Sequence, residues 1–237
     1  MINKTIKALM TLIAISSLSS FAYAGSFGIG VSGNIASVSA SGSESESANT
    51  GTENSIRDAT AGNEFAYGSI FAEYNFGERE LFTLGVDYIP GTADVNRKTI
   101  SRTDATADST ETDQQNGTRS ANAELSDHIT YYAELATPIG LYGKIGFAQV
   151  DVKTKDTETH AATTDGLYPD KTLDAWTYGI GYKGSFGNNG FFKVEGFYTD
   201  YDQYSATSSS AATSASDKTV KADLDVVGAS LKLGYKF

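Results

Sequence analysis

The sequence predicts an all-β protein, an eight-stranded antiparallel up-and-down transmembrane β-barrel with short periplasmic turns and four long external loops. Three observations support this fold class. The chain begins with an export signal, eight segments alternate apolar and polar residues, and the connections between them alternate between long and tight. Together these features are typical of a barrel that crosses an outer membrane.

The start of the chain has the three parts of a secretory signal: a positive region, a short apolar run and a small-residue cleavage site. These parts are Lys4 with Lys7, residues 8–18, and Ala22 with Ala24. The apolar run is too short to cross a membrane as a helix. We therefore expect a cleaved signal peptide at 1–24, followed by an outer-membrane β-barrel domain at 25–237.

The composition excludes several classes of protein. The net charge is −11, which argues against nucleic acid as a partner. The chain has no cysteine, so an exported domain of this sequence has no disulfide framework. Two histidines without cysteine rule out an ordinary zinc site, and we expect no metal and no cofactor. The 14 Tyr and 12 Phe are typical of strands that carry aromatic girdles.

Eight segments alternate with period two, which places successive side chains on opposite faces of a strand. They are 27–32, 69–76, 82–88, 128–135, 141–148, 176–183, 192–199 and 227–237. After the fifth segment, Val150 and Val152 fall out of phase with the apolar residues before them. We expect a bulge there, or a strand that runs above the membrane.

The connections between the segments alternate in length. Three are tight and rich in Gly, Asn or Pro, at 77–80, 137–140 and 187–190. Four are long and polar, at 41–63, 91–122, 153–172 and 203–219. Short periplasmic turns and long external loops are the pattern of an up-and-down membrane barrel. The low-complexity tips of these loops cannot order themselves, whereas their bases can continue the barrel as polar ribbons.

Alternation alone fits both a soluble barrel with an apolar inside and a membrane barrel with an apolar outside. The polar face carries four acids and four bases: Glu73, Asp87, Glu134, Lys144, Lys183, Lys193, Glu195 and Lys232. The apolar face carries aromatic residues near both predicted membrane boundaries: Phe76, Phe82, Tyr88, Trp176, Phe186, Phe192, Tyr198 and Phe237. Aromatic girdles of this kind face lipid, so the charged face is predicted to be the inside.

The last segment ends in Leu231, Leu233, Tyr235 and Phe237, all on the apolar face. Here the chain resembles the small eight-stranded outer-membrane β-barrel family, which includes the OmpA transmembrane domain, OmpX and the opacity proteins. The resemblance covers 25–237 in architecture, but residue for residue only this terminal signature and scattered strand patterns. It implies that the signature is the assembly signal, and that the partners are the barrel-assembly machinery, outer-membrane lipid and lipopolysaccharide.

The interior of an eight-stranded barrel is only wide enough for side chains, and charges buried there must pair. The expected pairs join Glu73, Glu134 and Glu195 to Lys144, Lys183, Lys193 and Lys232. Asp87 lies further up and is expected to face water. Such a network plugs the barrel. The alternative is a narrow or gated porin-like pore for small solutes, in which the pairs exchange partners.

The hypotheses for function follow from a closed lumen and long loops. The first is a structural and surface-interaction barrel that acts in envelope integrity or adhesion, with an extracellular surface ligand bound by the loops. A lipid A-modifying enzyme is a further alternative, because His128 has hydroxyl and acid groups near it at Ser126, Thr130 and Glu134. His128 is predicted to point inward, away from lipid, and His160 sits in a polar loop. No catalytic residue is therefore assigned, and the chain is not expected to be an enzyme.

Overall fold

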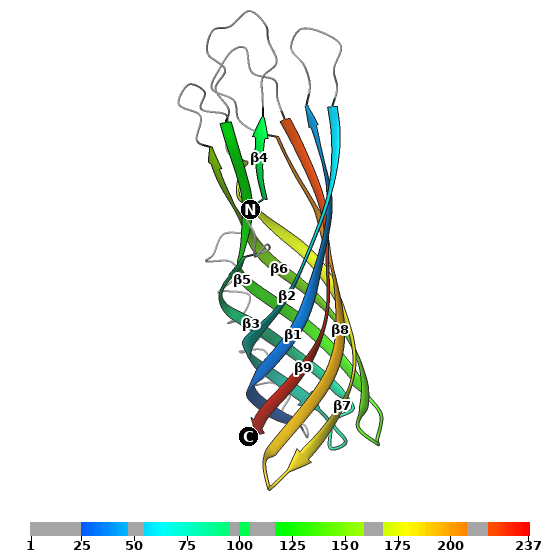
Figure 1. Ribbon diagram of the computed structural model, residues 1–237. Helices are drawn as coiled ribbons and strands as arrows, with labels where there is room; N and C mark the ends of the chain where they lie inside the picture. Colours follow the sequence, from blue (N-terminus) through cyan, green and yellow to red (C-terminus); the bar gives the residue numbers. More distant parts are fainter. Residues whose placement is uncertain (1–24, 47–54, 95–99, 105–116, 159–167, 208–217) are drawn as a thin grey trace, which may run out of the picture.

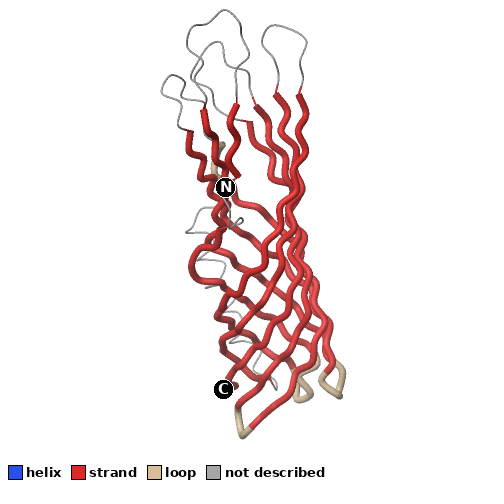
Figure 2. Tube along the Cα trace, in the orientation of Figure 1, coloured by secondary structure: helices blue, strands red, loops and turns tan. Residues whose placement is uncertain are grey.

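The computed structural model describes residues 25–46, 55–94, 100–104, 117–158, 168–207 and 218–237, which form one tall barrel (Figures 1 and 2). The expected signal peptide, His160 and the tips of the long loops lie outside the described residues. Among the described residues, no helix is long and apolar enough to cross a membrane.

Within the described part of the chain, nine strand segments build the barrel. They are β1 (Gly25–Glu46), β2 (Ser55–Phe76), β3 (Phe82–Asp94), β4 (Ile100–Asp104), β5 (Gly117–Ala136), β6 (Leu141–Glu158), β7 (Lys171–Phe186), β8 (Gly190–Thr207) and β9 (Lys218–Lys236). Both β3 and β4 pair with β5, so they share one position in the wall. Each strand is antiparallel to its neighbours, and the β3–β5 and β1–β9 pairings close the ring. The predicted eight-stranded antiparallel barrel is confirmed.

The three predicted tight turns are present at the end of the barrel where the chain also finishes (Figure 2). The turn at 77–80 is closed by the Glu80 amide, which donates to the Gly77 carbonyl at 3.0 Å. Gly140 shows why glycine is needed in the second turn. It has a φ of 91°, and a Cβ there would lie 2.4 Å from the Lys183 carbonyl oxygen. Local sequence thus sets these turns directly.

The strands extend much further from the turns than the sequence alternation indicated. Much of each expected long loop is strand: β1 runs to Glu46, β2 begins at Ser55, β6 runs to Glu158 and β8 runs to Thr207. The 22 residues of β1 span about 70 Å at roughly 3.3 Å per residue, and at a tilt near 40° they rise about 55 Å. An apolar membrane band is only about 25 Å tall. The expected ribbons are therefore present and rise well above such a band. Figure 1 shows the long strands continuing at the end opposite the tight turns.

The face that lines the lumen changes its chemistry along each strand. In β6, Lys144 points into the lumen near the turns, and Ala148, Val150 and Val152 are buried on the same face further up. The pairing of β6 with β7 is regular from Leu141 to Val152. Of the two expectations for Val150 and Val152, a bulge in β6 is therefore absent, whereas a strand that continues above the membrane band agrees with the length of β6. The phase is kept, and the inside of the barrel becomes apolar instead.

The upper lumen is lined by one apolar core, to which most of the wall contributes. Its buried members are Ala36, Val38, Ala148, Val150, Val152, Leu173, Ala175, Tyr201, Tyr204, Ala206, Leu224 and Val226. The outer face at this level carries polar residues such as Asp174 and Asp200, whereas Trp176 and Tyr178 lie exposed on it below. The lower barrel is thus polar inside and apolar outside, and the upper barrel is the reverse. This exchange marks the outer boundary of the membrane band.

In the strands that the structure describes, bulges occur in three, all on the loop side of the aromatic girdle residues. The register shifts by one residue between Ile89 and Thr92 in β3, between Ser126 and Ile129 in β5, and between Tyr201 and Tyr204 in β8. Two of the extra segments contain residues with positive φ, Gly91 at 96° and Asp127 at 51°. Such bulges bend the strands and increase their twist.

Candidate functional site

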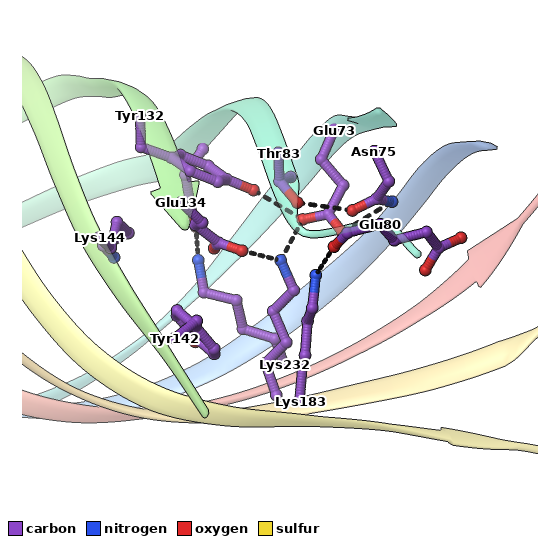
Figure 3. Close-up of polar contacts among 12 residues, drawn as sticks. Glu73, Asn75, Glu80, Thr83, Tyr132, Glu134, Tyr142, Lys144, Lys183 and Lys232 are labelled. Atoms are coloured by element: carbon purple, nitrogen blue, oxygen red, sulfur yellow. Dashed lines mark hydrogen bonds and ion pairs between the residues drawn. The ribbon is translucent and has the colours of Figure 1, made fainter. Parts of the chain in front are cut away.

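The centre of the lower lumen is a lysine held between two carboxylates. Lys193 Nζ on β8 lies 2.5 Å from Glu73 Oε2 on β2 and 2.7 Å from Glu134 Oε2 on β5. All three side chains are at most 1% exposed. Tyr132 donates its hydroxyl to the same Glu73 oxygen at 3.0 Å. Figure 3 shows Glu73, Glu134 and Tyr132 converging inside the barrel.

A second pair lies beside this centre. Lys144 on β6 forms an ion pair with Glu195 on β8, and Tyr142 donates its hydroxyl to the other Glu195 oxygen at 2.9 Å. Glycine at position 179 leaves room for it, because a Cβ there would lie 3.1 Å from both the Glu195 carboxyl carbon and Lys144 Cε. The five charges of the two groups come from four strands, β2, β5, β6 and β8, so the ion pairs tie distant parts of the wall together.

Asp87 does not face water as expected. Lys232 Nζ on β9 lies 2.8 Å from Asp87 Oδ2 on β3, and the two side chains are 3% and 15% exposed. The lumen of an eight-stranded barrel is narrow, so the long side chain of Lys232 on β9 reaches Asp87 on β3 across it. Asp87 is thereby part of the paired network.

Lys183 has a different partner from the one expected. Its Nζ donates to the backbone carbonyl of Glu80 at 2.6 Å, in the first tight turn. The Glu80 carboxylate in turn pairs with Lys236 and accepts a hydrogen bond from Ser26 Oγ at 2.6 Å. The sequence reasoning missed this basal pair because it considered only strand residues, and Glu80 lies in a turn. Lys236, on the polar face of the last segment, was the signal that could have found it.

The basal pair changes the acidity of Glu80, which lies at the periplasmic end outside the membrane band. Partial burial favours the protonated carboxyl, but the hydrogen bonds from Lys236 and Ser26 and the charge of Lys183 favour the carboxylate. Their sum lowers the pKa of Glu80 below its usual value. The charged form of this carboxylate is therefore tied to the folded base of the barrel.

Aromatic rings fill the space that the charges leave. The ring of Tyr132 lies over Gly85, where a Cβ would be only 2.3 Å from the Tyr132 Cζ, and Tyr142 lies over Gly181 at 2.6 Å. Lys193 Nζ is 5.6 Å from the centre of the Tyr142 ring, within the range of a cation–π contact. The alternation places both tyrosines on the lumen face, but the pattern of charged residues does not predict a role for them. A glycine directly across the ladder from a lumen tyrosine is the signal that identifies them.

The outer surface carries the residues expected to meet lipid. Phe82, Trp176, Phe186 and Tyr198 are exposed, and Phe76, Tyr88 and Phe192 are partly exposed. Leu231, Leu233, Tyr235 and Phe237 are also exposed on the outside, and the Phe237 amide donates to the Phe27 carbonyl at 2.8 Å. A closed wall with apolar residues outside and paired charges inside is the build of a membrane-spanning barrel.

His128 points inward, and its Nε2 lies 2.9 Å from the Tyr201 hydroxyl. Ser126 Oγ has no hydrogen-bond partner among the described residues, and Glu134 is bound by Lys193. The residues proposed for a catalytic set are thus not joined to one another. Within the described residues, no three His, Asp or Glu side chains come together as a metal site.

No family model matches this chain, and a search of curated proteins gave no match. Similar solved structures include the outer membrane protease OmpT from Escherichia coli, at 9% identity and a TM-score of 0.48 over 90% of this chain and 97% of that one. OprG from Pseudomonas aeruginosa and AlkL each have 15% identity to this chain and a TM-score of 0.44, and each match covers 91% of this chain. The matched part is 97% of the OprG chain and 91% of the AlkL chain. All three are outer membrane proteins by name. These identities and TM-scores are too low to support a role for this chain. The assignment of a barrel rests on this chain's own strand pairing.

Proposed function

We propose that this chain is a sealed outer-membrane barrel with a structural and surface-interaction role, in envelope integrity or adhesion. The observation that carries the proposal is the burial of Lys193 between Glu73 and Glu134 across the lower lumen. Breaking a buried charge pair by removing one partner costs about 3–5 kcal/mol, so opening a path through these pairs is unfavourable. The sealed barrel is thereby favoured over a narrow solute channel.

The surface role is supported by the height of the wall above the membrane band. Its outer face is polar there and presents residues such as Asp174, Asp200 and Asp223 to the surroundings. A sealed lumen leaves this outer extension as the part that meets other cells or molecules. On this proposal the lower surface contacts outer-membrane lipid and lipopolysaccharide, the barrel-assembly machinery binds the terminal stripe, and an extracellular ligand binds the external end.

Planar-bilayer recording of the refolded full-length mature chain tests the seal. We expect no steady unitary conductance from the wild-type protein, nor from Glu73→Gln, in which the amide still fills the lumen. Lys153→Met, at an exposed position outside the wall, is the matched control. A reproducible unitary conductance in the wild type that changes in Glu73→Gln but not in Lys153→Met would establish the channel and overturn the proposal.

Complementation tests the surface role. A strain that lacks the protein is expected to lose surface attachment or resistance to envelope stress, and the wild-type gene restores the lost property. A variant with residues 208–217 replaced by a short Gly-Ser linker is expected to reach the outer membrane without restoring it. Full restoration by this variant and by equivalent replacements of 47–54, 105–116 and 159–167 contradicts a surface role.

A further inference from the structure

The upper lumen contains a cavity of about 200 Å³ at the level where the inside changes from polar to apolar. Its floor is formed by the paired charges Asp87, Lys232, Lys144 and Glu195, and its walls include Val150, Val226, Phe197 and Tyr201. An apolar cavity of about 150 Å³ is enough to hold a benzene molecule. The space therefore suits an occupant of roughly ten heavy atoms.

Polar atoms without partners are concentrated in the residues around this cavity. Of the four such buried side-chain atoms among the described residues, three belong to lining residues: Ser126 Oγ, His128 Nδ1 and Ser230 Oγ. The fourth, Glu134 Oε1, belongs to the charged network below. An unpaired buried polar group is destabilising, so an occupant that forms hydrogen bonds with these atoms would be favoured here.

The cavity opens sideways through the barrel wall. The pairing of β2 with β3 ends at Ile70 and Tyr88, although β2 continues upward to Ser55 and β3 continues to Asp94. Where β2 and β3 separate, the cavity is lined by residues of both strands: Phe65, Ala66 and Tyr67 on β2, and residues 89–92 on β3. Local sequence explains the end of the pairing, because Pro90 has no N–H to donate and Gly91 has a φ of 96° within the bulge.

The charges of the floor decide the chemistry of the occupant. Lys144 and Lys232 already pair with Glu195 and Asp87, so neither lysine is free to bind a carboxylate or a phosphate. Serine hydroxyls both donate and accept hydrogen bonds, and an imidazole nitrogen does one or the other according to its tautomer, so these groups match an alcohol or a phenol. The apolar side opening lies just above the membrane band, where small amphiphiles concentrate.

From these observations we propose that the upper lumen is a binding site for a small neutral amphiphile, with an apolar body and one hydroxyl group, that enters between β2 and β3. The hydroxyl meets Ser126, His128 or Ser230, and the apolar body packs on the walls. This site is separate from the surface role proposed above and needs no open path through the lower lumen.

Fluorine NMR of the mature protein in lipid nanodiscs tests the proposal, with 4-(trifluoromethyl)benzyl alcohol as the probe. We expect a saturable bound signal that is absent from empty nanodiscs. The matched compound with a methyl in place of the CH₂OH group is expected to bind at least about tenfold more weakly, since it lacks the hydroxyl. The double variant Ser126→Val with Ser230→Val is expected to weaken binding of the alcohol by a similar factor. Ser39→Val, at an exposed site on the outer face, should leave binding unchanged.

Two further variants separate site from route. Val150→Phe fills the cavity and is expected to abolish the bound signal. If this variant does not fold, Ala66→Trp at the exposed rim of the cavity gives the second test. It is expected to slow the exchange of the probe between the free and the bound state. Ala229→Trp, on the lipid face, is the control and should leave this exchange unchanged. The proposal is overturned if the wild type gives no saturable signal beyond that of empty nanodiscs. It is also overturned if the methyl compound binds as tightly as the alcohol, or if neither Val150→Phe nor Ala66→Trp changes the signal.

Discussion

Lys193 is the residue on which the lower lumen depends most. It carries one positive charge against two carboxylates, all three nearly inaccessible to solvent. The rings of Tyr132 and Tyr142 lie within 6 Å of its ammonium group and exclude water from it. Lys232 and Lys144 each already have an acid of their own, so neither is free to balance the second carboxylate of this trio.

Removal of the Lys193 charge should therefore weaken the fold strongly. Lys193→Met leaves Glu73 and Glu134 buried without their shared partner, and we expect a loss of about 3–5 kcal/mol of unfolding free energy. Urea unfolding in detergent micelles, followed by the shift in gel mobility on heating, measures it. The triple variant Lys193→Met with Glu73→Gln and Glu134→Gln should recover much of the loss, because it removes the uncompensated charges. Lys153→Met should change stability by less than about 0.5 kcal/mol, and a Lys193→Met protein as stable as wild type contradicts the role of the trio.

Glu80 should make the stability of the barrel base depend on pH. The pKa of Glu80 is lower in the folded state than in the unfolded state, where it is close to 4.5. Its carboxylate therefore stabilises the fold fully at pH values above the unfolded pKa. This contribution is lost as the pH falls through the lower pKa of the folded state. Glu80→Gln lacks this contribution at every pH. The difference in unfolding free energy between wild type and Glu80→Gln is therefore expected at pH 7 and should shrink toward zero below pH 4.5. A difference that stays constant across this range would show that the carboxylate charge is not responsible.

Among the structural elements, the last strand is expected to act in assembly as well as in the wall. Leu231, Leu233, Tyr235 and Phe237 form an exposed stripe on the outside, and Phe237 follows the last ladder residue of β9. On the proposed role as assembly signal, Phe237→Ala should lower the fraction of protein inserted in the outer membrane several-fold. Refolding of the same variant in detergent micelles should remain close to wild type, because the side chain packs little.

Two measurements separate recognition from stability in this strand. The inserted fraction is read in cells from heat-modifiable protein in the outer-membrane fraction, and stability is read from urea unfolding in vitro. Phe82→Ala, an exposed phenylalanine at the same end of the barrel, is the matched control and should insert normally. Equal insertion of Phe237→Ala and wild type would remove the terminal residue from the assembly signal.

Elements that depend on residues close together in the sequence could be predicted from the sequence. Elements that depend on contacts with other strands could not. Gly77 and Glu80 close the first turn through a hydrogen bond within four residues, without reference to the rest of the chain. The sequence alternation does not locate the strand ends, because β1 beyond Ser39 is rich in serine and glutamate and becomes a strand only through its pairing with β2 and β9. The partners of Asp87 and Lys183 depend on the stagger of strands around the barrel, which alternation along one strand does not contain.

At the scale of the whole molecule, two kinds of barrel are joined in one wall. Near the turns the lumen is charged and the outside apolar, and above the aromatic residues the lumen is apolar and the outside polar. Water surrounds the upper part, so burying Val150, Leu224 and Val226 inside it is favourable there. The apolar upper core gives a long extension its own packing, and the unbroken register of β6 with β7 carries both parts without a hinge in those strands.

This exchange of faces predicts where each side of β6 meets lipid or water. The chain has no cysteine, so single cysteines carrying a nitroxide label can be placed at Ile145, Lys153 and Val150 without other changes. A label at Ile145, on the lower outer face, should be accessible to dissolved oxygen and shielded from a water-soluble nickel reagent. Lys153 lies on the same face, eight residues further up. A label there should be accessible to the nickel reagent and less accessible to oxygen than the label at Ile145, because this position lies above the membrane band. A label at Val150 faces the upper core and should be poorly accessible to both. If the label at Lys153 is shielded from nickel as well as the one at Ile145, the membrane band extends higher than the exchange of faces implies, and the upper barrel is not surrounded by water.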